Sequence, residues 1–64
     1  PGVVLEFKRL EKDRSLEGMA EEALRQIQRH RYMAELEDLG ASPIYCFGIA
    51  FSGKEVLVRV YQHS

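Results

Sequence analysis

The feature that most constrains this chain of 64 residues is an uninterrupted apolar run at positions 44–51. The run is rich in aromatic and β-branched side chains, follows Pro43, and ends at the turn signal Ser52-Gly53. A run of this length and composition is typical of a central β-strand that is covered on both faces. The chain must therefore build a sheet around this strand and find apolar cover for both of its sides.

Hydrophobic periodicity predicts three further elements. Apolar residues recur at steps of three and four over positions 16–38, which predicts one long amphipathic helix, with Ser15 as its N-cap and Gly40 just beyond its end. Positions 3–10 are mostly apolar, and we interpret this segment as the first strand. Positions 55–62 alternate between apolar and polar side chains, which indicates a strand with one covered face.

The resulting order, β-α-β-β, predicts an α+β fold with α/β-like character in a single partial domain over positions 1–64. A strand, a helix and a neighbouring strand usually form a right-handed parallel crossover, and the last two strands should form a hairpin. We therefore expect a three-stranded mixed sheet with the long helix on one face. The second face needs cover from elsewhere, either from an N-terminal portion preceding Pro1 or from a second copy of the chain.

Composition limits the possible function. A net charge of −1 argues against a protein whose whole surface binds polyanions. A local basic patch is possible at Arg25 and Arg29, one helical turn apart, although these side chains equally suit a solvated face that pairs with neighbouring glutamates. The single Cys46 excludes an internal disulfide, and its apolar setting indicates a buried residue of a reduced, cytoplasmic protein. No apolar stretch is long enough to span a membrane.

Glu6 and Lys8 form the candidate site. Side chains two residues apart on a strand lie on the same face, with α-carbons roughly 6.5 Å apart. Val3, Leu5 and Phe7 would then face the core, and the charged pair would point away from the helix. A carboxylate beside an ammonium group suits a divalent metal and a developing negative charge. The alternative is an ordinary solvated surface pair.

Three segments together resemble the PD-(D/E)XK nuclease superfamily. They are the strand ending Leu5-Glu6-Phe7-Lys8, the helix carrying Ala20-Glu21-Glu22-Ala23-Leu24-Arg25-Gln26-Ile27 and Tyr32, and the run from Ile44 to Ser52. More narrowly, nearly the whole chain is similar to the C-terminal nuclease-like domain that follows an AAA-ATPase-like domain in many bacterial proteins. The resemblance implies a partial restriction-endonuclease-like core, DNA as substrate, Mg²⁺ as cofactor, and an AAA-ATPase-like domain in the parent chain.

The resemblance also implies roles for individual residues. The superfamily glutamate that matches Glu6 helps bind magnesium, and the lysine that matches Lys8 contacts the attacking water or the phosphate. One branch adds a Gln-x-x-x-Tyr motif, whose spacing is present in Gln28 and Tyr32 and would place both on one helix face. The narrower family instead features the glutamine before an isoleucine, which is Gln26. Both glutamines stay candidates, and either could simply be a polar residue at the edge of the apolar stripe.

One element of the superfamily pattern is missing. Its aspartate lies on the strand before the Glu-x-Lys strand, whereas this chain starts at Pro1, and Asp13 and Asp38 follow the motif. One carboxylate alone would bind Mg²⁺ poorly. We therefore expect the C-terminal portion of a nuclease-like domain that is inactive as this fragment. The alternative is a non-catalytic interaction module that self-associates, as a homodimer, through an exposed sheet edge and face.

Overall fold

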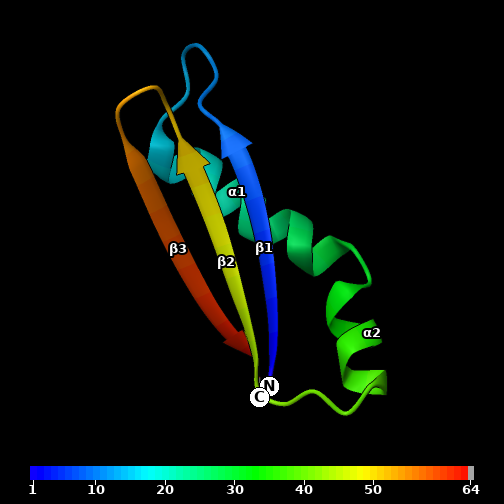
Figure 1. Cartoon of the computed structure of the whole chain (residues 1–64). Helices are drawn as coiled ribbons and strands as arrows, with labels where there is room; N and C mark the ends of the chain where they lie inside the picture. The colour runs from blue at the N-terminus through cyan, green and yellow to red at the C-terminus, as the bar shows by residue number, and fades with distance from the viewer. Residues whose placement is uncertain (64) are drawn as a thin grey trace.

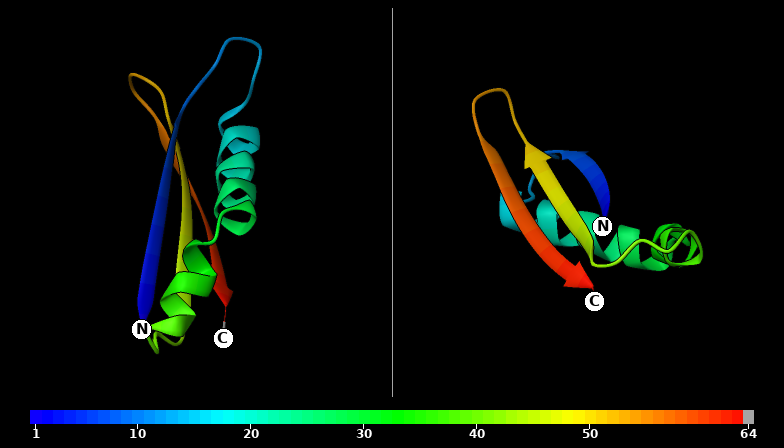
Figure 2. Two further views of the ribbon diagram at one scale, coloured as in Figure 1. Left: turned by 90° about the vertical axis from the view of Figure 1, so that its right-hand side faces the viewer. Right: turned by 60° about the horizontal axis from the view of Figure 1, so that its bottom comes forward.

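Three strands and two helices follow one another in the computed structural model, which describes residues 1–63. The strands form one sheet in the order β1-β2-β3, with β1 parallel to β2 and β3 antiparallel to it. Helix α1 covers one face of this sheet, and α2 lies near the start of β1 (Figures 1 and 2). The predicted α+β fold with a mixed sheet is confirmed. The elements are β1 (Gly2–Arg9), α1 (Leu16–Arg29), α2 (Tyr32–Asp38), β2 (Ile44–Phe51) and β3 (Val56–His63).

Helix α1 begins where the sequence predicts. The Ser15 hydroxyl accepts a hydrogen bond of 3.0 Å from the backbone N–H of Gly18, which satisfies one free donor of the first turn. Glu17 in the first turn and Arg29 in the last complement the helix dipole. The apolar stripe of α1 is buried against the sheet through Met19, Ala20, Ala23 and Ile27.

The prediction of one continuous helix over positions 16–38 is wrong. Helix α1 ends at Arg29, His30 adopts extended backbone with ψ 164°, and α2 begins at Tyr32. The helices have 14 and 7 residues, and neither helix of residues 1–63 is long and apolar enough to cross a membrane. The strands, in contrast, start and end within one residue of the predicted positions.

The break between the helices follows from the position of Arg31. In a continuous helix Arg31 would lie one turn after Ile27, on the buried stripe, where an unpaired guanidinium group is costly. The break leaves Arg31 exposed and changes the phase of the helix. Helix α2 can then pack Met33 and Leu36 against the apolar cluster that contains Ile27 and Ile44.

The closest approach between α1 and the sheet occurs at Gly48, in the middle of β2. A β-carbon added at Gly48 would overlap the carbonyl oxygen of Ala20 and lie 3.0 Å from the backbone nitrogen of Leu24. The neighbouring helix-facing residues of β2, Cys46 and Ala50, are small and fully buried. Because Gly48 has no side chain, the backbone of α1 can pack directly against β2.

Burial also defines the chemistry of Cys46. The side chain is fully buried, as predicted, and desolvation raises the pKa of its thiol. A thiol that is both inaccessible and protonated is a poor nucleophile, so Cys46 acts as part of the core.

The two faces of β1 are the reverse of the prediction. Val3, Leu5 and Phe7 lie on the face opposite α1 and are 59%, 51% and 58% exposed, so they do not form the core. Gly2 and Val4 face the helices instead, and Val4 packs against the cluster around Ile27. The expectation that the helical layer covers only one face of the sheet is confirmed, and residues 1–63 provide no cover for the other face.

We predict that Gly48→Ala lowers the free energy of unfolding by at least about 2 kcal/mol, because the methyl group must displace backbone atoms of α1 rather than a mobile side chain. Gly53→Ala is the matched control, since a β-carbon at Gly53 meets nothing within 4 Å. Urea unfolding followed by circular dichroism measures both changes. Equal stability of the two variants would show that the close approach is not required.

Candidate functional site

Glu6 and Lys8 lie on the same face of β1, as the strand periodicity predicts. Val4, Glu6 and Lys8 are half-buried, whereas the intervening residues of β1 are exposed. Because Val4 packs against the helical layer, Glu6 and Lys8 face the helical side of the sheet. The prediction that the pair points away from the helix is therefore wrong, and the candidate site lies beside α1.

Strand register explains why a charged group can occupy this side. Glu6 pairs with Gly48 of β2, and Gly48 pairs with Arg59 of β3. Because α1 rests on Gly48, Glu6 and Arg59 lie on the two sides of the helix. Arg59 forms ion pairs with Glu21, at 3.3 Å, and Glu17, at 3.5 Å, which places this flank of α1 over β3. The opposite flank of α1 therefore faces β1.

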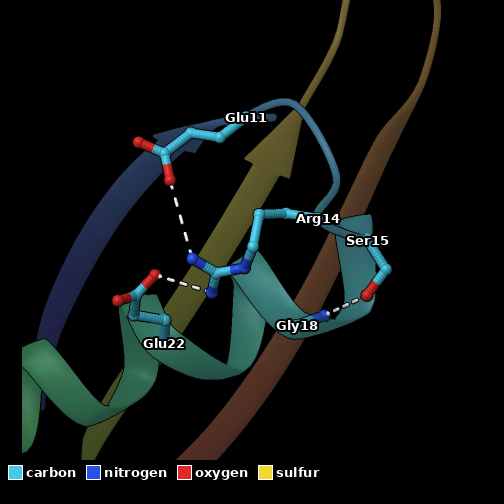
Figure 3. A network of polar contacts seen from close by, with 5 residues as sticks. All are labelled: Glu11, Arg14, Ser15, Gly18 and Glu22. Atoms are coloured by element: carbon cyan, nitrogen blue, oxygen red, sulfur yellow. Dashed lines mark hydrogen bonds and ion pairs between the residues drawn. The ribbon is translucent and has the colours of Figure 1, made fainter.

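The flank of α1 that faces β1 carries Glu22 and Gln26, one helical turn apart. Arg14, in the loop after β1, forms ion pairs with Glu22 at 3.2 Å and with Glu11 at 3.6 Å (Figure 3). Gln26 follows Glu22 by four residues and is half-buried. Gln26 is thus on the side of α1 that faces β1.

The ion pair between Arg14 and Glu22 is not predicted by the sequence. The two residues are eight positions apart and belong to different elements, so helical spacing gives no signal for them. The loop brings them together through Asp13, whose φ of 64° lies in the left-handed region that aspartate tolerates. No local pattern in the sequence would have identified this pair.

Gln28 and Tyr32 are not brought to the same place. Gln28 is exposed and follows Glu21 by seven residues, so it lies on the flank of α1 that faces β3. Tyr32 belongs to α2, beyond the break at His30. The expectation that Gln28 and Tyr32 share one face of a continuous helix is therefore wrong. Of the two candidate glutamines, Gln26 lies on the β1 side.

Tyr32 lines an open cavity of about 330 Å³ between α2 and the first half of β1. The walls are mostly apolar, and Tyr32 and Glu35 supply the polar side chains. Glu6 and Lys8 are not among the lining residues. The cavity therefore adjoins the candidate strand but does not contain the charged pair.

The basic candidates Arg25 and Arg29 are exposed on α1. The expected alternative, pairing with neighbouring glutamates along the helix, is not observed within residues 1–63. Glu21 and Glu22 instead pair with arginines outside α1, as described above. Arg25 and Arg29 remain solvent-facing cations on the helix.

Glu6 and Lys8 have no ion pair or side-chain hydrogen bond with any residue of the described chain. Within residues 1–63, no group of three or more histidine, cysteine or acidic side chains could hold a metal ion. The Glu6 carboxylate is a suitable hard ligand for Mg²⁺, but alone it supplies only part of a coordination shell. The described chain therefore does not contain a complete metal site.

We predict that Glu6→Gln and Lys8→Met each change the free energy of unfolding by less than about 0.5 kcal/mol, because neither substitution breaks a polar contact of the described chain. Ser15→Ala is the positive control and should cost about 1 kcal/mol through loss of the helix cap. Urea unfolding measures all three. A loss above about 1 kcal/mol at Glu6 or Lys8 would indicate a structural role for the pair.

One comparison with known proteins identifies a family for this chain. A family model described as the PD-(D/E)XK nuclease superfamily matches residues 2–61, from the first residue of β1 into β3. Searches of curated proteins and of solved structures gave no significant match. Because the matched segment covers nearly the whole sequence, the chain belongs to the PD-(D/E)XK nuclease superfamily.

Proposed function

We propose that this chain is the C-terminal portion of a nuclease-like domain whose ancestry is a metal-dependent DNA phosphodiesterase. The observation that carries the proposal is that Glu6 and Lys8 lie on the same face of β1. Both are half-buried, and neither contacts another polar side chain of residues 1–63. If Glu6 or Lys8 had only a structural role, its charged group would be expected to contact an oppositely charged side chain. Membership of the superfamily supports nucleic acid as the class of substrate.

In this proposal Glu6 is a ligand for Mg²⁺, and Lys8 contacts a phosphate oxygen or the attacking water. The two side chains are two residues apart on one face of the strand, so the strand holds the Lys8 ammonium group next to the Glu6 carboxylate. A bound magnesium ion would polarise the phosphodiester and help to generate hydroxide. Lys8 would offset the negative charge of the phosphate at close range.

Gln26 is the helix residue that best fits a supporting role, because it is half-buried on the β1 side of α1. Its amide could donate a hydrogen bond toward a group held between β1 and α1. Gln28 and Tyr32 are weaker candidates, since both are exposed and neither lies on that flank of α1. Arg25 and Arg29 would add only peripheral contacts to DNA phosphates.

We also propose that the 64 residues are inactive by themselves. No acidic residue precedes Glu6 among the 64 residues, so these residues do not themselves supply the superfamily aspartate. A parent chain with an AAA-ATPase-like domain before the nuclease-like domain would be the natural setting for this segment. A second carboxylate would then come from another part of the nuclease-like domain.

We predict weak binding of Mn²⁺, with a dissociation constant in the millimolar range, because a single carboxylate supplies few ligands. Titration into isotopically labelled protein should broaden NMR signals of β1 residues around Glu6. Glu6→Gln should abolish this broadening, and the control Glu55→Gln, at an exposed carboxylate next to β3, should preserve it. Broadening that centres on Glu11 or Glu22 and survives Glu6→Gln would contradict the role of Glu6.

We predict that the chain does not nick supercoiled plasmid DNA in the presence of Mg²⁺ or Mn²⁺, because the metal shell is incomplete. Agarose gel electrophoresis over several hours provides the measurement. Metal-dependent nicking by the wild-type chain that disappears in both Glu6→Ala and Lys8→Ala would overturn the proposed inactivity.

A further inference from the structure

Helix α2 has few of the features that stabilise α1. It has only seven residues, and a helix this short is not stable alone in water. No side chain caps its N-terminus, and none of its residues is fully buried. Glu37 and Asp38 place negative charge at its C-terminal end, where the helix dipole is also negative. Helix α2 therefore depends on tertiary contacts for its stability.

The apolar anchor of α2 consists of two side chains. Met33 and Leu36 pack against the buried cluster that contains Ile27 and Ile44. Leu36 also approaches the start of β1, since a β-carbon added at Gly2 would lie 3.1 Å from its Cδ1 atom. Both anchor side chains remain partly exposed, so their detachment would transfer less apolar surface to water than the detachment of α1.

A single polar side-chain contact joins α2 to the sheet within residues 1–63. The Nε2 atom of His63, at the end of β3, lies 3.1 Å from a carboxylate oxygen of Glu37. Both side chains are partly exposed to solvent, and contacts of this kind contribute little to stability. An open cavity of about 210 Å³ adjoins both residues, so packed side chains do not enclose the contact.

Helix α2 lies beside the start of β1 in Figures 1 and 2. The cavity of about 330 Å³ is lined by residues of α2 together with Val3, Val4 and Leu5. Val4 faces the helical side of the sheet, whereas Val3 and Leu5 face the other side. Because β2 occupies one edge of β1, side chains from both faces of β1 can line one cavity only around its outer edge. Helix α2 therefore lies over the outer edge of the first half of β1.

We propose that α2 is a flap that opens and closes over the first half of the outer edge of β1, while α1 and the sheet stay folded. Extended backbone at His30 and the left-handed residue Gly40, with φ 84°, mark the two ends of the flap. No hydrogen bond of residues 1–63 joins α2 to β1, so opening breaks none there. The flap does not involve Glu6 or Lys8 and is independent of the proposed function.

Native-state hydrogen exchange followed by NMR tests the proposal. The amide of Glu35, which donates to the carbonyl of Arg31 in α2, should exchange at least about tenfold faster than that of the buried Ala23 in α1, after correction for intrinsic rates. Low urea concentrations should accelerate exchange in α1 and leave α2 nearly unchanged, because opening α2 exposes little surface. Equal protection and equal urea dependence in the two helices would overturn the proposal.

The contact with His63 can be removed without changing α2 itself. His63→Ala should accelerate exchange throughout α2 about two- to fivefold, as expected for loss of an exposed polar contact, and leave α1 unchanged. The matched control is Gln62→Ala, at an exposed neighbour whose side chain points to the opposite face of β3. Equal effects of the two substitutions would contradict the role of His63 in closing the flap.

A variant that opens the flap tests what α2 covers. Leu36→Asp should detach α2, because a carboxylate would replace an apolar anchor. A soluble paramagnetic agent should then broaden the amide signals of Val3 and Leu5 at least about twofold more than in the wild-type chain. Phe7, which does not line the cavity, is the control on the same strand.

Circular dichroism and the exchange of α1 verify that the remaining structure of Leu36→Asp is folded. If this variant does not fold, His63→Ala provides the same comparison of amide signals. Unchanged signals at Val3 and Leu5, in a variant whose α2 amides exchange faster, would show that α2 does not cover the edge of β1 and would overturn the proposal.

Discussion

The contact of α1 with Gly48 is the constraint on which the remaining structure depends. Since a side chain at this position would collide with the backbone at Ala20, the helix lies directly over β2. The edge strands then flank the helix, and long charged side chains at their helix-facing positions can reach past it. Arg59 uses this position to pair with glutamates of α1, whereas Glu6, in the same row of the sheet, has no such partner in the described chain. One glycine thus determines where the candidate site lies.

The site and the apolar face use opposite sides of a sheet only three strands wide. This separation accounts for the burial pattern of β1, in which the charged residues are half-buried and the apolar residues are exposed. Membership of the nuclease superfamily gives Glu6 and Lys8 a chemical context, although residues 1–63 contain no group of three or more histidine, cysteine or acidic side chains that could hold a metal ion. Covering the apolar face of the sheet and supplying a second carboxylate beside Glu6 therefore involve opposite faces of the sheet.

The sequence predicted the strands, the N-cap at Ser15 and the common face of Glu6 and Lys8, because these depend on local periodicity and capping. The direction of that face could not be predicted, since the apolar side of β1 looked like core although nothing in residues 1–63 covers it. The helix break was not predicted, because the aliphatic part of the Arg31 side chain fits the spacing of the apolar stripe. The spacing alone does not show that the guanidinium group of Arg31 cannot be buried there. The placement of Gln26 and the ion pair between Arg14 and Glu22 depend on tertiary geometry, for which helical spacing carries no signal.

Strand β1 combines the Glu-x-Lys pair with the outer edge of the sheet, because β2 is its only neighbour within the described chain. Its outward backbone N–H and C=O groups are therefore free to accept another strand. Residues of such a strand would lie about 5 Å from β1, close enough for an acidic side chain opposite Glu6 to share one cation with it. The addition of one strand would then satisfy the free hydrogen-bonding groups of β1 and add a ligand to the cation at the same time.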